Sequence, residues 1–221
     1  MGKLECIRKL EIFEHLSNDE LENVASFCNK KFYKPGEFLF FELDNVENIY
    51  IISSGRIKLS KLSVNGKELT LGFAVNNAVF GEEALFSDEL YSMNSEAVEE
   101  SCVTICSKND MEELFLNKPQ IAVKVIQSLS KKLNHSTKQM SDLAFRNVRE
   151  RLISTLQRLA ENYGHKTNEG WMIDFQLTHN ELASIINASR VTVTHTLTKL
   201  RDEGIVTIDD RQIFIHNLNV M

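Results

Sequence analysis

Apolar and polar residues follow two different periods along this chain of 221 residues. In residues 3–29, and again from residue 110 onward, apolar side chains recur every three or four positions, which predicts helices with one buried face. Between Lys31 and Ser107 the apolar residues come in short runs divided by turn residues, which predicts β-strands. Because Asn65-Gly66 lies between two such runs, it predicts a tight hairpin.

The β-rich part contains seven short strand candidates. They are Phe38–Phe41, Asn48–Ile52, Arg56–Leu62, Glu68–Phe73, Ala78–Phe80, Met93–Ala97 and Cys102–Cys106. Short strands at this spacing favour a compact antiparallel barrel or jelly roll.

A long helix is predicted after Pro119, because proline suits the first turn of a helix, where its missing amide needs no partner. Along this helix two rows of residues repeat every seven positions: Ile126, Leu133 and Met140, and Ala122, Leu129, Ser136 and Leu143. A seam of this kind over three heptads predicts pairing with a second copy of the chain. The alternative is that the same face packs against the chain's own barrel. Other helices are predicted at 110–117 and Arg149–Tyr163.

Two further helix starts lie eleven residues apart, at Thr178 and Ser189. Thr178 and Glu181 have the spacing of a capping box, and Ser189 is a favourable N-cap residue. Asn187, which tolerates the left-handed conformation, ends the first helix. The inward faces of the two helices are apolar: Leu182, Ile185 and Ile186, then Val193, Leu197 and Leu200. This arrangement is typical of a helix-turn-helix whose recognition helix spans 189–202.

Two short strand candidates follow this recognition helix, one with Ile205 and Thr207 and one with Ile213 and Ile215, around a tight turn at 209–212. A hairpin in this place is typical of a wing that lies along the phosphate backbone. The alternative is an ordinary helix pair whose polar residues face water. The wing favours a winged helix-turn-helix, and so duplex DNA as the partner.

Composition is that of a soluble globular protein and not of a membrane protein. Hydrophobic residues make up 43% and charged residues 25% of the chain. No apolar run reaches the roughly 18 residues of a membrane span, and the N-terminus lacks the apolar core of a signal peptide, so we expect a cytoplasmic protein.

The net charge of −6 is unevenly distributed along the chain, because residues 1–117 carry 11 Lys and Arg against 21 Asp and Glu. Residues 118–145 carry 5 against 1, and residues 146–221 carry 9 of each. A neutral DNA-binding end predicts modest non-specific affinity.

The four cysteines, Cys6, Cys28, Cys102 and Cys106, show no zinc-type spacing. Cys102 and Cys106 lie on one face of a predicted strand but about 13 Å apart, too far for a shared disulfide. We therefore expect most of the four to be buried free thiols.

Several local motifs occur together with this order of helix, barrel, seam helix and winged helix-turn-helix. They are Pro35-Gly36-Glu37, the run from Ile49 to Leu59, Phe80-Gly81-Glu82, Leu143-Ala144-Phe145 and Ser189-Arg190-Val191-Thr192-Val193. In this joint order the chain resembles the CRP/FNR family of bacterial transcription regulators over essentially its whole length.

The resemblance implies an α+β fold in three parts. Residues 1–117 would form an effector-sensing antiparallel β-barrel or jelly roll of the cyclic-nucleotide-binding type, residues 118–145 a dimerisation helix, and residues 146–221 a winged helix-turn-helix DNA-binding domain. It also implies a homodimer on a palindromic operator of double-stranded DNA, an effector in the barrel that sets the affinity, and RNA polymerase as a further partner.

The DNA contacts implied by the resemblance centre on the Ser189-Arg190 motif, whose arginine forks onto guanine O6 and N7 in the family. Val191 stands where many relatives carry a glutamate; valine only presses on a thymine methyl, which predicts a more A/T-rich half-site. His195 replaces a common arginine. The other expected contacts, to phosphates or methyl groups, come from Thr192, Thr194, Lys199 and Arg211, and the two cations are alternatively solvated surface charges.

The effector site keeps only part of the family pattern. Cyclic-nucleotide members hold the ribose with Gly-Glu, here Gly81 and Glu82, and the phosphate with an Arg-Ser pair about ten residues later. Residues 90–94 read Leu-Tyr-Ser-Met-Asn without an arginine, so we do not expect cyclic AMP or GMP. We expect an unidentified small molecule between barrel and seam helix, at Gly81, Glu82, Tyr91, Ser92, Ser136 and Thr137. The alternatives are that these polar residues are solvated, or that the regulator works without an effector.

Cofactors and catalysis find little support in the residues. Only Cys6 lies near the N-terminus, where iron–sulfur relatives carry several cysteines, and no histidine lies between residues 16 and 134, so neither a cluster nor haem is expected. The missing histidines also argue against a metal-bound cupin enzyme. We therefore predict a ligand-responsive DNA-binding regulator and not an enzyme; the alternative is the same fold acting constitutively or through cysteine oxidation.

Overall fold

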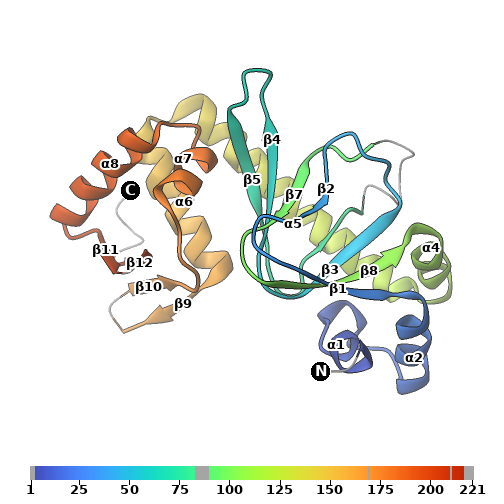
Figure 1. Ribbon diagram of the computed structural model, residues 1–221. Helices are drawn as coiled ribbons and strands as arrows, with labels where there is room; N and C mark the ends of the chain where they lie inside the picture. Colours follow the sequence, from blue (N-terminus) through green and yellow to red (C-terminus); the bar gives the residue numbers. More distant parts are fainter. Residues whose placement is uncertain (1–2, 83–89, 169, 210, 217–221) are drawn as a thin grey trace. The chain divides into compact units, whose positions relative to one another are not determined.

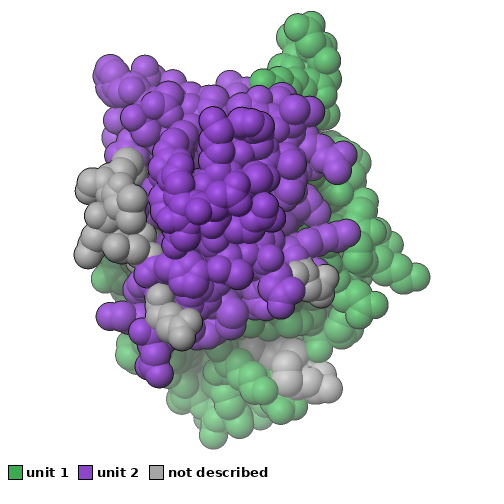
Figure 2. All heavy atoms as spheres, turned by 90° about the vertical axis from the view of Figure 1, so that its left-hand side faces the viewer, with its two compact units in different colours: residues 1–67, 71–134 green, residues 68–70, 135–221 purple. Residues whose placement is uncertain are grey.

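The computed structural model describes residues 3–82, 90–168, 170–209 and 211–216 (Figure 1). The chain divides into two compact units, which Figure 2 colours separately. Unit 1 comprises residues 1–67 and 71–134, and unit 2 comprises residues 68–70 and 135–221. The α+β class predicted from the sequence is confirmed, because each unit combines antiparallel sheet with helices.

Unit 1 begins with short helices and continues into strands. The helices are α1 (Lys3–Arg8), the 3-10 turn η1 (Glu11–Phe13) and α2 (Asn18–Phe27). The strands are β1 (Asn29–Tyr33), β2 (Phe38–Phe40), β3 (Asn48–Ser54), β4 (Ile57–Leu62), β5 (Glu68–Ala74), β6 (Val79–Phe80), β7 (Asn94–Ala97) and β8 (Ser101–Ser107). They form two four-stranded sheets, β1-β8-β3-β6 and β2-β7-β4-β5. After them come α4 (Lys108–Asn117) and α5 (Pro119–Phe145). The first three residues of β5 and the part of α5 from His135 onward belong to unit 2.

The central strand β3 shows how unit 1 builds its core. Successive side chains of a strand point to opposite faces of the sheet. Ile49 and Ile51 pack in a cluster with residues of α1, α2, α4 and α5, whereas Tyr50 and Ile52 pack in a second cluster with residues of the other sheet. The sheet is therefore buried on both faces, by helices on one side and by the second sheet on the other.

Unit 2 contains the predicted winged helix-turn-helix. Its elements are α6 (Val148–Tyr163), β9 (Gly164–Thr167), β10 (Gly170–Ile173), α7 (His179–Ile185), α8 (Arg190–Asp202), β11 (Val206–Asp209) and β12 (Gln212–Ile215). The strands form one sheet in the order β11-β12-β10-β9. The wing is thus half of a four-stranded sheet.

Three strands are absent from the sequence-based prediction: β1, β9 and β10. In β1 only Tyr33 of its five residues is buried, and β9 has no buried residue, so neither shows the apolar alternation that marks a half-buried strand. Both lie at the edge of a sheet.

The helix starts are confirmed by their caps. In α2 the Ser17 side chain accepts the Glu20 amide while the Glu20 carboxylate accepts the Ser17 amide, at 3.3 and 2.8 Å. Thr178 and Glu181 repeat this arrangement at the start of α7, at 3.1 and 2.7 Å. Each cap satisfies amides that a helix start leaves without partners, which is why the sequence marks these boundaries well.

The expectation of free thiols is wrong for two cysteines. Cys28 caps the C-terminus of α2, Cys106 lies in β8, and the two form a disulfide with their Cα atoms 4.3 Å apart. Both are fully buried in the cluster between the sheet and the helices. A separation of 78 residues along the chain carries no pairing signal, because only the fold brings α2 against β8. Cys102 is buried and outside this disulfide, and the side chain of Cys6 lies outside the described residues.

Candidate DNA-binding surface and effector site

The helix-turn-helix is held by an apolar contact between α7 and α8. Leu182 and Ile186 on one side, and Val193, Leu197 and Leu200 on the other, are almost completely buried. Asn187 lies in the turn with a φ of 51°, in the left-handed region that asparagine tolerates better than most residues. The Ser189 hydroxyl then accepts the Thr192 amide at 3.1 Å and caps α8.

Every residue predicted to contact DNA is exposed to solvent. The set is Ser189, Arg190, Val191, Thr192, Thr194, His195, Lys199 and Arg211. All but Arg211 come from α8 and its cap, and Arg211 lies in the turn between β11 and β12. Their contacts with DNA remain a prediction.

Ion pairs explain which cations of this unit are available to a polyanion. Arg149 pairs with Glu203 through two hydrogen bonds, at 2.7 and 3.1 Å, and Arg146 lies 3.0 Å from the Asp142 carboxylate. Arg151 donates to the carbonyls of Ile186 and Arg146 and so joins α6 to the helix-turn-helix. By contrast, Arg190, Lys199 and Arg211 form no ion pair with any residue that the structure describes.

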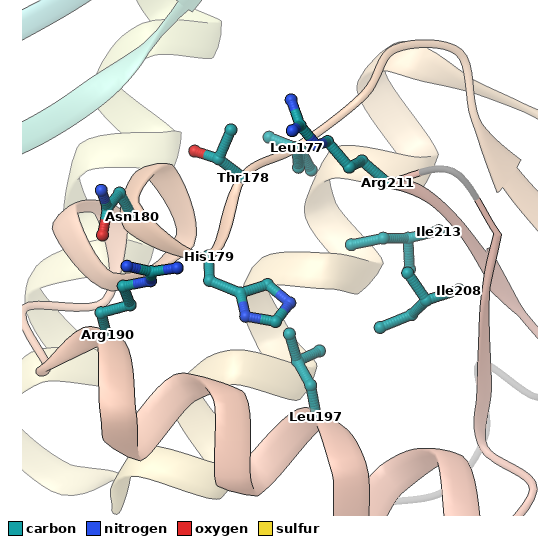
Figure 3. Close-up of a pocket in the computed structure, with 9 residues that line it drawn as sticks. All are labelled: Leu177, Thr178, His179, Asn180, Arg190, Leu197, Ile208, Arg211 and Ile213. Carbon is teal, nitrogen blue, oxygen red and sulfur yellow. The ribbon is translucent and has the colours of Figure 1, made fainter.

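A hollow of about 370 Å³ lies between α7, α8 and the wing (Figure 3). Arg190 reaches it from the first turn of α8 and Arg211 from the turn of the wing, where its φ is 63°. The other lining residues are Leu177, Thr178, His179, Asn180, Leu197, Ile208 and Ile213. The two arginines therefore border one concave surface, although they are 21 positions apart in the sequence.

His179 belongs to this surface and is absent from the sequence-based prediction. Its Nδ1 lies 2.7 Å from the Thr194 hydroxyl and so joins the first residue of α7 to the middle of α8. Its place directly after the N-cap Thr178, at the end of α7 nearest the predicted contacts, is a signal that could have identified it.

The predicted effector residues are distributed over both units. Gly81, Glu82, Tyr91 and Ser92 belong to unit 1, whereas Ser136 and Thr137 lie on the part of α5 that belongs to unit 2. Their common role therefore stays a prediction.

Glu82 is engaged by a residue that the sequence-based prediction missed. Lys132 of α5 donates to Glu82 Oε1 at 2.6 Å and to the Val79 carbonyl at 2.7 Å. Glu82 is 7% exposed, and its Oε2 is buried without a hydrogen-bond partner among the described residues. The surplus of positive charge on residues 118–145, beside the acidic residues 1–117, is a signal that could have suggested such a pair.

Tyr91 lies in the segment 90–94, which contains no arginine, and it is 2% exposed. Its ring stacks on Phe40, with centroids 3.8 Å apart, and its hydroxyl donates to the Asn48 carbonyl at 2.9 Å. Tyr50 and Phe80 extend this aromatic group, and burial raises the pKa of Tyr50 well above its usual range. Tyr91 therefore packs in the apolar core of unit 1.

The seam helix α5 exposes one of its two predicted rows. Ile126, Leu133 and Met140 are 58%, 68% and 62% exposed. In the second row Ala122, Leu129 and Leu143 are half-buried and Ser136 is exposed. Ile121 and Val125 are instead buried in the core of unit 1, so the helix packs on its own unit with a different face. No helix within the described residues is long and apolar enough to cross a membrane.

A β-domain with this topology, followed by a long helix and a winged helix-turn-helix, defines a two-domain DNA-binding regulator of transcription. Two family models match: the cyclic nucleotide-binding domain over residues 30–118 and the Crp-like helix-turn-helix domain over residues 150–221.

Curated relatives cover most of the chain. The anaerobic regulatory protein of Bacillus subtilis is 30% identical over 203 residues, which are 91% of this chain and 85% of that protein. The global nitrogen regulator of Synechococcus elongatus is 29% identical over 187 residues, 84% of each protein. The chain therefore belongs to the CRP/FNR family.

Solved structures show the same fold. A mutant of CooA from Carboxydothermus hydrogenoformans superposes with a TM-score of 0.80 at 18% identity, covering 95% of this chain and 92% of that one. FixK2 from Bradyrhizobium japonicum superposes with a TM-score of 0.76 at 21% identity, covering 86% and 93%. At these identities the likeness concerns the fold alone.

Proposed function

We propose that this chain is a homodimeric regulator that binds a palindromic duplex operator through α8, controls transcription there through contacts with RNA polymerase, and catalyses no reaction. The observation that carries the proposal is Arg190, which is exposed at the first turn of α8 and free of ion pairs among the described residues. An arginine there can fork onto guanine O6 and N7 in the major groove. Since the partner is chromosomal DNA, we expect the protein in the cytoplasm.

The proposed dimer rests on the exposed row of α5. Three large apolar side chains at heptad spacing, Ile126, Leu133 and Met140, face solvent in the isolated chain, which is unfavourable unless a partner covers them. A dimer through this row also brings a second DNA-binding unit to the operator. A single unit of zero net charge would bind DNA only weakly. Two-fold symmetry then predicts half-sites about one helical turn apart.

Selection from random duplexes tests this function. The full chain is mixed with a random duplex library at fixed salt, bound duplexes are amplified, and affinities are measured by fluorescence anisotropy. Enrichment of a palindrome with a guanine in each half-site is expected. A failure to enrich any sequence, at any salt concentration tested, would reject sequence-specific binding.

The proposed effector binds within unit 1 near Glu82, with Gly81, Tyr91 and Ser92 in its surroundings. A buried carboxylate oxygen without a hydrogen-bond partner costs about 1–3 kcal/mol, which favours a ligand that brings an N–H or O–H donor to Oε2. The missing arginine disfavours a cyclic phosphate.

Operator affinity measured with different small molecules tests the effector. We expect no change with cyclic AMP or cyclic GMP, and a change with the small-molecule fraction of a bacterial lysate. Glu82→Gln should abolish the response, whereas Glu14→Gln, which removes an exposed carboxylate elsewhere on unit 1, should retain it. An equal response of both variants would reject Glu82 as the binding residue.

The Cys28–Cys106 disulfide supports a second candidate, a thiol-responsive regulator. Exchange with a small-molecule disulfide such as oxidised glutathione would take two electrons and two protons from the two thiols and leave two reduced thiols in solution. The bond joins α2 to β8, so its reduction would loosen the helical side of the sensor domain.

Operator affinity in reduced and oxidised glutathione distinguishes the two candidates. A redox regulator loses its response when both Cys28 and Cys106 are changed to serine and keeps it with Cys102→Ser. Affinities that do not depend on the glutathione couple would reject the thiol-responsive form.

A further inference from the structure

Three threonine hydroxyl groups of the recognition helix α8 form hydrogen bonds with the backbone of the same helix. Thr194, Thr196 and Thr198 donate to the carbonyls of Arg190, Thr192 and Thr194, each four residues earlier, at 2.9, 2.8 and 3.0 Å. A hydroxyl carries a single proton. These three side chains therefore have no proton left for a phosphate or a base.

The hydroxyl of Thr194 is engaged a second time. It lies 2.7 Å from His179 Nδ1, and because its own proton points to the Arg190 carbonyl, the ring nitrogen must be the donor. At the start of the helix the Ser189 and Thr192 hydroxyls lie 2.8 Å apart and bond to each other. The polar atoms of these threonines are thus directed to the protein.

Three exposed residues then form one stripe on the outward face. Val191, Thr194 and Thr198 are spaced by three and four positions, which places them within about 60° of one another around the helix axis. The buried row of Val193, Leu197 and Leu200 lies on another face, centred roughly 125° away around the helix axis. With both hydroxyls held by carbonyls, this stripe offers DNA an isopropyl group, 78% exposed on Val191, and two threonine methyl groups.

We propose that Val191, Thr194 and Thr198 read the C5-methyl groups of thymines in each half-site, beside the guanine contacted by Arg190. This inference rests on the proposed function of α8 as the recognition helix. The methyl group of thymine is the apolar feature that distinguishes the major-groove edge of an A·T pair, and threonine methyl groups pair with it. The stripe would therefore recognise thymine methyl groups by apolar contact, whereas Arg190 at the first turn would recognise guanine through its charged guanidinium.

Deoxyuridine tests the proposal, because it lacks only this methyl group and keeps base pairing and phosphates. The duplex selected by the full chain is synthesised with deoxyuridine at one thymine after another, and affinities are measured by anisotropy. Loss of one buried methyl contact should weaken binding about fourfold, and adjacent contacts should accumulate. Equal affinity for thymine and uracil at every position would overturn the proposal.

Two variants of Thr198 separate methyl from hydroxyl. Thr198→Val keeps a methyl group and removes the hydroxyl, and it should keep the preference for thymine over uracil. Thr198→Ser keeps the hydroxyl and removes the methyl, and it should lose that preference at one position. A loss of preference in the valine variant and not in the serine variant would assign the reading to the hydroxyl.

Sequence-specific binding and recognition of thymine methyl groups would be rejected by different results. If selection enriches no duplex, sequence-specific binding and methyl reading are both rejected. If a palindrome is enriched and bound but tolerates deoxyuridine throughout, only methyl reading is rejected. The deoxyuridine series uses the unaltered chain, so it decides the question even if a variant fails to fold.

Discussion

Arg190 is the residue on which base discrimination depends most. Its guanidinium is exposed at the first turn of α8, and its backbone carbonyl accepts the Thr194 hydroxyl, so the turn that carries it is braced. We predict that Arg190→Ala weakens operator binding by about 1–3 kcal/mol per lost contact and abolishes discrimination at one guanine in each half-site. Anisotropy titrations against duplexes changed at each base pair measure both effects.

Lys199 provides the matched comparison, because it is an exposed cation of the same helix without an ion pair among the described residues. A lysine that contacts only phosphate carries no sequence information. Lys199→Ala should therefore weaken all duplexes about equally and reduce the salt dependence. If Arg190→Ala showed this uniform pattern instead, its assignment as a base-reading residue would be contradicted.

The sequence identifies which of these side chains are exposed but not what their polar atoms bind. Helical periodicity places Thr194 and Thr198 away from the apolar face, and Arg190 is exposed because it lies in the first turn. Whether a threonine hydroxyl turns to DNA or to the carbonyl four residues earlier depends on its rotamer and on His179, which belongs to another helix. The partner of each threonine hydroxyl can therefore be identified only from the folded structure.

At the scale of elements, the turn between α7 and α8 determines how the recognition helix is presented. Asn187 has a positive φ of 51°, a conformation that costs an ordinary L-residue roughly 1–2 kcal/mol. We predict that Asn187→Ala lowers the melting temperature by about 2–4 °C, whereas Asn187→Gly, which loses the same side chain but adopts this φ freely, lowers it less. Calorimetry of the full chain measures the difference, and equal shifts would show that the side chain matters and not the backbone.

Elements with strong local signals could be predicted, and those that depend on partners could not. Helices such as α2 and α7 begin at capping boxes, which are visible as residues three positions apart. Strand β9 has no buried residue and owes its place to pairing with β10, so its own residues carry little signal. The Cys28–Cys106 disulfide and the Glu82–Lys132 pair join elements distant in sequence, and only the fold brings them together.

For the whole molecule, the proposed dimer would supply affinity through two copies of the DNA-binding unit. Residues 146–221 carry nine positive and nine negative charges, and arginines such as Arg149 and Arg151 are held in contacts within the unit. A single DNA-binding unit therefore gains little affinity from phosphate neutralisation. Linking two units through α5 would raise the effective concentration of the second unit at its half-site and so increase affinity without new contacts on either half-site.

In the proposed dimer, operator affinity should be most sensitive to substitutions in the exposed row of α5, apart from those in the DNA-binding surface. Leu133→Glu places a charge in the middle of the exposed row of Ile126, Leu133 and Met140, where pairing would bury it, and we predict monomers. Binding to a full palindrome should fall about a hundredfold or more, to the affinity for a single half-site. Asn134→Glu, one position away and outside both rows, adds the same charge and should remain dimeric.

Sedimentation velocity measures the oligomeric state of both variants, and anisotropy with full and half operators measures their affinities. A dimeric Leu133→Glu variant with unchanged affinity would place the interface elsewhere, whereas a monomer that still prefers the palindrome would show that the two DNA-binding units contact each other on DNA.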